Sequence, residues 1–388
     1  MAAVTNGEVL RVAPEFRLVR SGRFVVAELL VPHRVLSTSA RNGGQSEGLR
    51  FLLNHQSCEG TDHRERHTVI MGNAEYHDLA CREIEIDPSL AAMMQTAANM
   101  NYAAVVAAND LDVTVTAVVT AGVHGNAACA GDSASWRETE TGWEKVGVGE
   151  AGPVAGTINT MVLINHALTE GALARAVMTM TEAKSAALQR LAVRSLYSAD
   201  FATGTGTDQY CVAAVLRKGS NDGGGKEFVS TSPHSKLGEL IGVTVRDATL
   251  EALRWQNGLE VSSTRLLFHA LGRYGVREAD CLTELAPLLS ERELELFKKN
   301  FRSVVYEPKV AAAAYAIAAV LDRIRAGTLP ASATGDIFRQ QLATLASSLA
   351  AKPDAWTEFY AWLADVDPEQ AERGVYAAIA LGWSHKWK

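Results

Sequence analysis

The stretch Gly156-Thr-Ile-Asn-Thr-Met-Val-Leu-Ile164 starts with polar residues and continues as an apolar run, which predicts a strand over 158–164. An alanine-rich helix is predicted to follow from Thr169 to Val193, and a second strand from Tyr210 to Leu216. Strands that alternate with long helices indicate an α/β fold. We therefore expect a layered α/β sandwich around this strand–helix–strand core.

Further strands are predicted on the N-terminal side of this core. Phe16–Arg20 and Phe24–Val31 flank Ser21-Gly22 and predict a hairpin. Two more β-type runs lie at 103–108 and 113–119. A hairpin makes its strands antiparallel, so we expect a mixed β-sheet flanked by helices, not a purely parallel one.

Helix signals stand on both sides of these strands. Asp87-Pro88 combines an N-cap residue with a proline at the first helical position, and predicts a helix that runs to about Met100. Beyond residue 262 the pattern is nearly all helical, with a capping box at Ser290 and Glu293. The expected domains are an α/β domain over 1–262 and an all-α C-terminal region over 263–388.

Composition excludes several classes of protein. The formal net charge of -7 and the pI near 5.8 argue against a nucleic-acid binder, which would normally be basic. Apolar stretches such as 310–321 are shorter than the ~20 residues that a membrane span needs, and the N-terminus carries no secretory signal pattern. The five cysteines are scattered and form no CxxC pair, which favours reduced thiols in a cytoplasmic protein.

Three polar, glycine-containing segments lie beside the apolar runs. Loops of this kind, held by rigid elements, are where α/β folds place ligands, so we expect the three segments to form one polar pocket. The segments are Thr120-Ala-Gly-Val-His-Gly-Asn126 leading to Ala130-Gly-Asp132, then Gly156-Thr-Ile-Asn-Thr160, and then Asp200-Phe-Ala-Thr-Gly-Thr-Gly-Thr-Asp-Gln209.

Lys184 lies in the middle of the apolar stripe of the predicted helix, with Glu170 at its edge and Glu182 on the solvent side. A lysine that faces a core must find a carboxylate, reach water or lose its proton. One hypothesis is a pocket lysine, paired with Asp132 or Asp208, that stabilises negative charge or relays a proton. The alternative is that its stem packs while its ammonium reaches solvent.

The Thr203–Asp208 loop offers closely spaced N–H groups and hydroxyls, and Gly204 and Gly206 permit close approach of the backbone to a ligand. It matches neither the Walker pattern nor the dinucleotide-binding fingerprint. Asp200 and Asp208 could supply a general base or could only anchor the loop through their own turns. A tight bend before the next strand is the structural alternative.

The other two segments contain further candidates. Asn126 could donate to an oxyanion and Asp132 could activate water. His124 could serve as an acid, although a lone histidine beside glycine is more often a surface residue, and Cys129 would need a base partner to act as a nucleophile. In an extended segment, Thr157 and Asn159 share one face, which we expect to line the pocket.

One charged stretch has the spacing of a metal site. If it is helical, His63 and His67 share a face, with Cys58 and His55 nearby. The intervening residues are highly charged, and none of them suggests a partner that would hold the metal ligands in place. A solvated charged segment is therefore the alternative to structural zinc.

The same segments resemble the adenosylcobinamide amidohydrolase family over roughly residues 30–257. The matching motifs are Leu36-Ser37 with Asn42-Gly43-Gly44, Thr120-Ala-Gly-Val with Gly125-Asn126-Ala and Ala130-Gly-Asp132, Gly156-Thr-Ile-Asn-Thr160, Leu168-Thr-Glu-Gly-Ala-Leu173, Thr181-Glu-Ala-Lys184, and Thr203-Gly-Thr-Gly-Thr-Asp208. The resemblance implies hydrolysis of the aminopropanol amide of adenosylcobinamide to adenosylcobyric acid and aminopropanol, in corrinoid salvage. It also implies that cobalt arrives with the substrate and that the protein needs no cofactor or metal of its own.

Chemistry then suggests roles for the candidates. Asp132 or Asp208 would act as the base toward water, while Lys184 and Asn126 polarise the carbonyl. The rival mechanism uses a threonine nucleophile, Thr157 or Thr207. Residues expected to contact substrate are Asn42, Thr157, Asn159, Glu170, Glu182, Thr203, Thr205 and Thr207.

Two other functions stay open. A non-catalytic corrinoid-binding protein would keep a wide pocket without needing Lys184 and the paired carboxylates. An amidase acting on a smaller amide would need a narrower pocket. The expected partner is a corrinoid small molecule, with no nucleic acid and no membrane, and the chain could also pair with copies of itself as a homo-oligomer.

Overall fold

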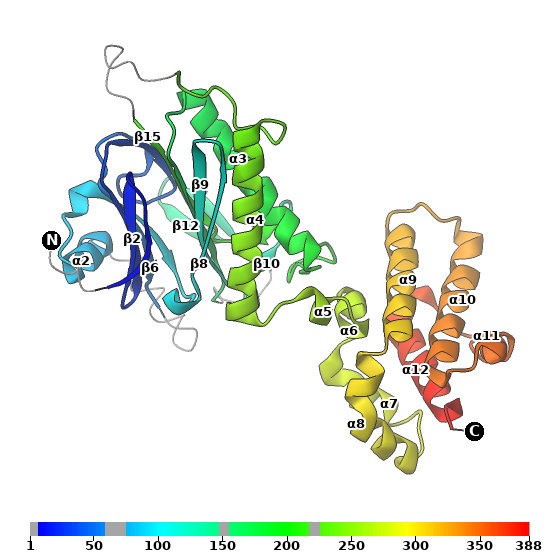
Figure 1. Ribbon diagram of the computed structural model, residues 1–388. Helices are drawn as coiled ribbons and strands as arrows, with labels where there is room; N and C mark the ends of the chain where they lie inside the picture. Colours follow the sequence, from blue (N-terminus) through cyan, green and yellow to red (C-terminus); the bar gives the residue numbers. More distant parts are fainter. Residues whose placement is uncertain (1–6, 59–74, 147–154, 217–225, 388) are drawn as a thin grey trace. The chain divides into compact units, whose positions relative to one another are not determined.

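The computed structural model describes residues 7–58, 75–146, 155–216 and 226–387 (Figure 1). The chain divides into two compact units, Met1–Glu260 and Val261–Lys388. This division lies beside the boundary expected near residue 262. The sequence-predicted pattern changes at the same place, from strands mixed with helices to helices.

The first unit contains two stacked sheets. In the smaller sheet, with the order β1-β2-β3-β6-β7, the pair β6–β7 is parallel and the other pairs are antiparallel. The hairpin predicted around Ser21-Gly22 is present as β2 and β3. The strands are β1 (Glu8–Val12), β2 (Phe16–Ser21), β3 (Phe24–Leu29), β6 (Phe51–Gln56) and β7 (Ala91–Thr96).

The larger sheet has the order β5-β4-β15-β13-β9-β8. Its central pair β13–β15 is parallel and all its other pairs are antiparallel, so the sheet is mixed as predicted. The strands are β4 (His33–Ser37), β5 (Gly44–Ser46), β8 (Ala104–Asp110), β9 (Val113–Ala121), β13 (Ile158–Ile164) and β15 (Gln209–Val215).

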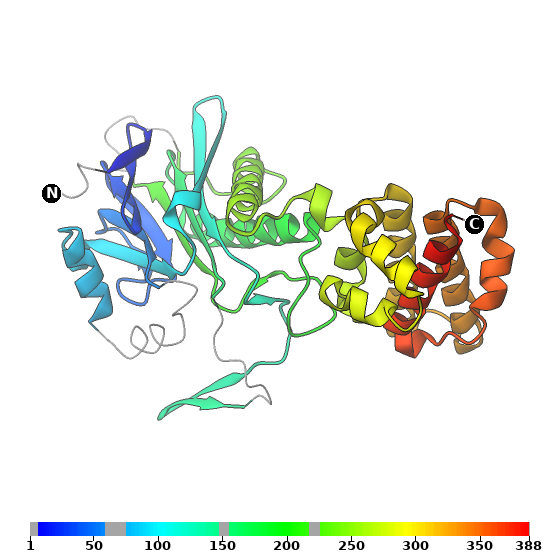
Figure 2. The ribbon, with the colours of Figure 1, turned by 90° about the horizontal axis from the view of Figure 1, so that it is seen from below.

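Helices cover the outer faces of both sheets and make four layers, α-β-β-α (Figure 2). The core between the sheets joins residues of both, among them Leu18 with Met161. The outer face of the smaller sheet packs on α2 (Tyr76–Glu83), and that of the larger sheet on α3 (Glu170–Arg190) and α4 (Lys236–Asn257). The predicted layered α/β sandwich is confirmed.

The pleat of β13 sorts its side chains between two environments. Ile158 and Val162 belong to the core under the helices, whereas Met161 and Leu163 belong to the core between the sheets. Because side chains alternate along a strand, Thr160 faces α3 and Asn159 faces the smaller sheet. Neighbouring polar residues of the same motif therefore point in opposite directions.

Helix α3 begins as the sequence indicates. The Thr169 side chain accepts a hydrogen bond from the N–H of Ala172 at 3.3 Å and caps the helix. Leu173, Met180 and Leu188 are buried, as the apolar stripe predicts. The stripe holds one face of α3 against β13 and β15, and this fixes the direction of Lys184.

The helix predicted from Asp87 to Met100 is wrong. Asp87 does cap and accepts from the N–H of Ser89 at 2.9 Å, but the helical turn is only the 3-10 segment η2 (Pro88–Leu90). The chain then continues as β7, which pairs with β6 and is buried on one face against the larger sheet and on the other in the core that contains α2. An apolar run buried on both faces has no alternation that would mark it as a strand.

Short strands connect the loops of the first unit. β10 (Ala127–Ala128) pairs with β14 (Gly204–Thr205), and the hairpin β11 (Trp136–Thr139) and β12 (Gly142–Lys145) projects from the unit (Figure 2). The pairing of β10 with β14 brings two of the three polar segments together.

The second unit is helical throughout the part that the structure describes, as predicted. The expected capping box is present at Ser290 and Glu293. Phe297, Phe338 and Trp383 are among the buried aromatic residues of its core. Its helices are α5 (Val261–Thr264), α6 (Leu267–Leu271), α7 (Cys281–Leu285), α8 (Glu291–Val305), α9 (Pro308–Arg325), α10 (Ala331–Ala350), α11 (Trp356–Trp362) and α12 (Ala371–His385).

Short 3-10 turns complete the description: η3 (Met100–Tyr102), η4 (Gly272–Tyr274), η5 (Glu278–Asp280), η6 (Pro353–Ala355) and η7 (Pro368–Gln370). Among the described helices, none taken singly is both long and apolar enough to cross a membrane. The pair α8 and α9 meets that test of length and composition only when combined, and it is bent by 78°.

Candidate active site

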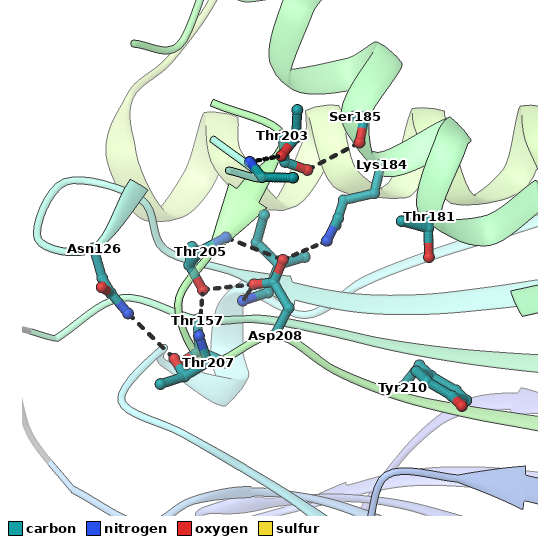
Figure 3. A network of polar contacts seen from close by, with 12 residues as sticks. Asn126, Thr157, Thr181, Lys184, Ser185, Thr203, Thr205, Thr207, Asp208 and Tyr210 are labelled. Carbon is teal, nitrogen blue, oxygen red and sulfur yellow. Dashed lines mark hydrogen bonds and ion pairs between the residues drawn. The ribbon is translucent and has the colours of Figure 1, made fainter. Parts of the chain in front are cut away.

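The three polar segments converge at one end of the larger sheet. Parallel β13 and β15 both start there, and antiparallel β9 ends there, since Ala121 lies opposite Ile158. The β10–β14 pairing places Ala128 opposite Gly204. Loops that are distant in the sequence thus form one polar cluster (Figure 3).

Lys184 and Asp208 form an ion pair at the centre of this cluster (Figure 3). Their side chains are only 14% and 16% exposed. The contact joins Nζ of the lysine to Oδ2 of the aspartate. Two hypotheses were open for Lys184. The structure agrees with the one in which its ammonium pairs with a carboxylate.

Asp208 accepts three further hydrogen bonds. Oδ2 accepts from the Thr205 N–H at 3.1 Å, while Oδ1 accepts from the Ile158 N–H at 3.0 Å and from the Thr205 hydroxyl at 2.6 Å. A carboxylate offers about four acceptor sites, so these donors and Lys184 occupy the group. The geometry suits Asp208 to anchoring the loop and orienting Lys184 better than to taking a proton from water.

Gly204 is required by the ion pair. A Cβ atom at this position would lie 2.7 Å from Nζ of Lys184 and closer still to Oδ2 of Asp208. Any larger residue would therefore push the pair apart. Gly204 therefore allows the close approach of the ion pair, and the approach of a ligand inferred from the sequence stays a prediction.

A second cluster of hydroxyl and amide groups lies beside the ion pair. The hydroxyls of Thr157 and Thr207 are 2.6 Å apart, and Thr207 donates to the Gly156 carbonyl at 3.0 Å. Asn126 Nδ2 donates to the same carbonyl at 3.2 Å. Tyr197, which the sequence interpretation missed, donates its hydroxyl to Asn126 Oδ1 at 3.0 Å.

Asp132 fixes the neighbouring loop. Its Oδ2 accepts from the N–H of Cys129 at 2.7 Å and from the hydroxyl of Ser195 at 2.6 Å. Burial raises the pKa of this carboxyl, but hydrogen bonds from Ser195, Ser198 and the Cys129 N–H outweigh burial and lower the pKa overall. The Asp132 carboxylate is therefore held in its charged form by the loop around it.

Thr203 ties this loop to α3. Its hydroxyl accepts from the N–H of Ala130 at 2.9 Å, and its carbonyl accepts from the hydroxyl of Ser185 at 2.9 Å. Because Ser185 is next to Lys184, the bond helps to fix the lysine relative to the loop. Thr203 is thus held by protein contacts on both sides.

A cavity of about 170 Å³ opens beside the ion pair. Apart from Lys184 and Asp208 it is lined by residues that the sequence interpretation did not single out as contacts. Its polar lining includes Thr38, Thr160, Thr181 and Tyr210. Strand alternation could have found two of them, since Thr160 and Tyr210 share the helix-facing side with Val162 and Val212.

Four expected contact residues lie outside the polar cluster. Glu170 accepts from Gln45 at 3.1 Å, and about 21 Å of helix separates it from Lys184. Asn42 donates to the carbonyls of Pro88 and Ala91, each at 2.8 Å. Asn159 is buried and donates to Asn54 Oδ1 at 2.8 Å. Glu182 is exposed beside Thr181 on α3 and lines a second depression.

The remaining candidates have no contact that favours catalysis. His124 is exposed. Cys129 is half-buried, and burial together with the nearby charges of Asp132 and Asp200 raises the pKa of its thiol, which disfavours the thiolate. Its Sγ lies 3.6 Å from the Ala130 carbonyl.

The suggested metal spacing does not assemble among the described residues. His55 stacks on Phe24 at 4.1 Å between ring centroids, and its Nε2 lies 3.0 Å from the Tyr76 hydroxyl. Cys58 is buried, whereas His63 and His67 lie outside the described residues. Within the described ranges, no group of three or more His, Cys, Asp or Glu side chains is placed to hold a metal ion.

Comparisons with known proteins agree with the resemblance in the sequence. The family model described as adenosylcobinamide amidohydrolase matches residues 10–261. An uncharacterized protein of Methanocaldococcus jannaschii is 35% identical over 191 residues, which are 48% of this chain and 72% of that protein.

A protein from Pyrococcus horikoshii of known crystal structure is 13% identical, and the match covers 64% of this chain and 81% of that protein. Its TM-score of 0.27 is too low to support an inference about the fold. The match to the family model covers well over half of the chain and all three polar segments. This chain therefore belongs to the adenosylcobinamide amidohydrolase family.

Proposed function

We propose that the protein hydrolyses the aminopropanol amide of adenosylcobinamide and releases adenosylcobyric acid and aminopropanol. The observation that carries this proposal is the ammonium of Lys184, held by Asp208 at the edge of a cavity, in a chain of this family. In the reaction, the oxygen of water adds to the amide carbon. The C–N bond then breaks, and the departing amine takes up the proton that the attacking water has lost.

Lys184 is the residue that we assign to the carbonyl oxygen. An ammonium has three N–H donors, and Asp208 takes one of them. The remaining donors can bind the oxygen on which negative charge develops in the tetrahedral intermediate. Donors fixed in advance at this position typically contribute ~10²–10³ in turnover.

Asp208 is a positioning residue in this scheme. Its four donors keep the carboxylate in one orientation, and through it the lysine in another. Asn126 and Thr207 lie on the far side of Asp208 from Lys184 and are not among the residues that line the cavity, so we assign them to holding the loop that carries Asp208 (Figure 3). The carboxylate of Asp132, in the neighbouring loop, is held by the hydrogen bonds that it accepts from Cys129 and Ser195.

A threonine nucleophile is less well supported by the contacts. Thr157 and Thr207 bond to each other, to the Gly156 carbonyl and, for Thr207, to Asn126. None of these described partners is a base that could take the hydroxyl proton. Water is therefore the nucleophile that we propose.

The cobalt of this reaction belongs to the substrate, and we propose no resident cofactor or metal and a cytoplasmic location. The cavity of about 170 Å³ suits an amide arm but not a whole corrin ring. The same volume would also suit a smaller amide. The test must therefore include a substrate that lacks the ring.

The deciding experiment incubates the protein with adenosylcobinamide and measures aminopropanol and adenosylcobyric acid by mass spectrometry. We expect one amine for each cobyric acid formed. A parallel sample receives the ring-free amide N-(2-hydroxypropyl)propanamide, for which we expect much slower release. Binding of the corrinoid without amine release would indicate a binding protein, and faster cleavage of the ring-free amide would indicate an amidase for small substrates.

A further inference from the structure

A second depression of about 490 Å³ continues from the cavity along α3. The two share Val177, Thr181 and Tyr210, so they form one continuous surface within the first unit. We call this second depression the α3 trough. Its walls also include Leu36, Met178 and Glu182.

The lining of the α3 trough is mostly apolar and open to solvent. Leu36 and Tyr210 reach it from the helix-facing sides of β4 and β15, and Met178 faces it from α3 with 58% of its surface exposed. An apolar depression that adjoins a candidate site is a surface on which part of a ligand can bind. Because it shares residues with the cavity at Lys184, the ligand that it would serve is the one whose amide enters that cavity.

We propose that the α3 trough binds the apolar face of the corrin ring, while the amide arm extends into the smaller cavity toward Lys184. This inference rests on the proposed function, because it assigns the ring of that substrate to a surface. The division fits the volumes, since the smaller cavity holds an arm and the trough lies within the usual ~300–1,000 Å³ of ligand sites.

The side chains in the α3 trough suit a ring of this kind. Methionine adapts its shape to irregular apolar surfaces, and tyrosine offers a flat face together with a polar edge. Thr181 lies between the trough and Lys184 and lines both depressions (Figure 3). It can therefore contact the substrate at the point where the arm leaves the ring.

The assignment separates binding from chemistry. We expect contacts to the ring, which lies away from the reacting amide, to be equal in the ground state and the transition state, so their loss should raise KM and leave kcat unchanged. Contacts to the carbonyl strengthen in the transition state, so their loss lowers kcat. Met178 and Tyr210 should therefore behave differently from Lys184.

The test compares Met178→Glu with two matched variants. Met178→Glu puts a charge into the α3 trough and should raise KM for adenosylcobinamide at least about tenfold, with kcat within about twofold of the wild type. Met178→Leu keeps an apolar side chain, so its KM should stay close to that of the wild type. Leu111→Glu adds the same charge at the β8–β9 turn, where Leu111 is 91% exposed, and should leave KM unchanged.

A ring-free substrate and a second variant sharpen the test. Cleavage of N-(2-hydroxypropyl)propanamide, however slow, should be equal in Met178→Glu and the wild type, because this amide does not reach the trough. Tyr210→Ala should also raise KM for adenosylcobinamide, and it keeps the inference testable if Met178→Glu folds poorly. Unchanged KM in both variants would overturn the α3 trough as the ring site.

Direct binding separates this inference from the proposed function. The dissociation constant of cobinamide, followed by its absorbance, should rise in Met178→Glu in parallel with KM. If the wild type binds cobinamide, releases no amine, and binds about tenfold more weakly as Met178→Glu, the trough stands and the hydrolase proposal falls. If the wild type releases amine but Met178→Glu binds as tightly as the wild type, the hydrolase stands and the trough falls.

Discussion

The two units of this chain each contain a cation–carboxylate pair, and the pairs differ in what surrounds them. In the first unit, Lys184 contacts Asp208 beside a cavity, and the lysine keeps donors that the carboxylate does not use. In the second unit, Arg273 makes two contacts with Asp322, which also accepts from the Tyr274 hydroxyl. The Arg273 side chain is 6% exposed and that of Asp322 is 43% exposed.

The comparison separates an ion pair suited to stability from one whose surroundings fit the catalytic role proposed above. Arg273 and Asp322 join η4 to α9 within a helical core, where the fork of the guanidinium matches the carboxylate. The Lys184–Asp208 pair is fixed by three hydrogen bonds that Asp208 accepts from Ile158 and Thr205, and by a glycine that leaves room for it. Of these two pairs, the one with Lys184 leaves a positioned charge facing open space.

The largest expected effect is on turnover, from Lys184→Met. This substitution keeps the length of the side chain and removes its charge, so kcat should fall by about 10²–10³-fold. Asp208 keeps three other donors, and unfolding should therefore stay cooperative. Steady-state kinetics with adenosylcobinamide, together with circular dichroism, measure both. A kcat within tenfold of the wild type would remove Lys184 from the mechanism.

Gly204→Ala should have the next largest effect, because its Cβ would displace the ion pair. We expect the free energy of unfolding to fall by ~1–3 kcal/mol and kcat to fall with it. Gly242→Ala in α4 is the control, since nothing lies within 4 Å of its added Cβ. That variant should be more stable by ~0.5–1 kcal/mol in urea unfolding. Equal behaviour of the two would show that Gly204 is not required by the pair.

Asp322→Asn should affect stability and leave turnover unchanged. Burial raises the pKa of Asp322, but hydrogen bonds from Arg273 and Tyr274 lower it overall. The stabilisation is thus present above the unfolded Asp value of ~3.9 and is lost as the pH falls through the lower folded pKa. Because Asp322 is partly exposed, we expect only about 1 kcal/mol at pH 7.

Urea unfolding of the full chain at several pH values checks this expectation. The difference between wild type and Asp322→Asn should be largest near neutral pH and should shrink below about pH 4. A difference that does not change with pH would mean that the charge of Asp322 contributes nothing.

The smallest expected effect is that of Cys129→Ser. The raised pKa of this thiol and its contact with the Ala130 carbonyl argue against a nucleophile. Turnover should stay within about twofold of the wild type, as is usual for a substitution away from the chemistry. A loss of more than a hundredfold in the same amine-release assay would bring back a covalent mechanism through cysteine.

Much of the first unit could be predicted because its elements carry local signals. The apolar run 158–164 became β13 with the same bounds, and the stripe that contains Lys184 placed the lysine on the buried side of α3. The strand β7 was missed because its residues are buried from both sides, and the cap at Asp87 suggested a longer helix than η2. Local signals mark the start of an element better than they mark its length.

The site could be predicted only in part, because polar residues of one motif can face different layers. Asn159 and Thr160 are adjacent, yet the first bonds across the two sheets and the second lines the cavity. Asn42 and Glu170 also belong to motifs shared with the family, but their side chains bond to Pro88 and Gln45, away from the cavity. Tyr197 and Thr38 come from segments whose approach depends on the pairing of β10 with β14 and of β4 with β15, which no local pattern reveals.

The most direct test of the central claim is a crystal structure with adenosylcobyric acid bound. Its newly formed carboxylate stands where the amide carbonyl was. We predict that one oxygen of this carboxylate lies within hydrogen-bond distance, ~2.7–3.2 Å, of Lys184 Nζ, with the ring in the α3 trough. A product bound elsewhere, with Lys184 contacting only Asp208, would contradict the account.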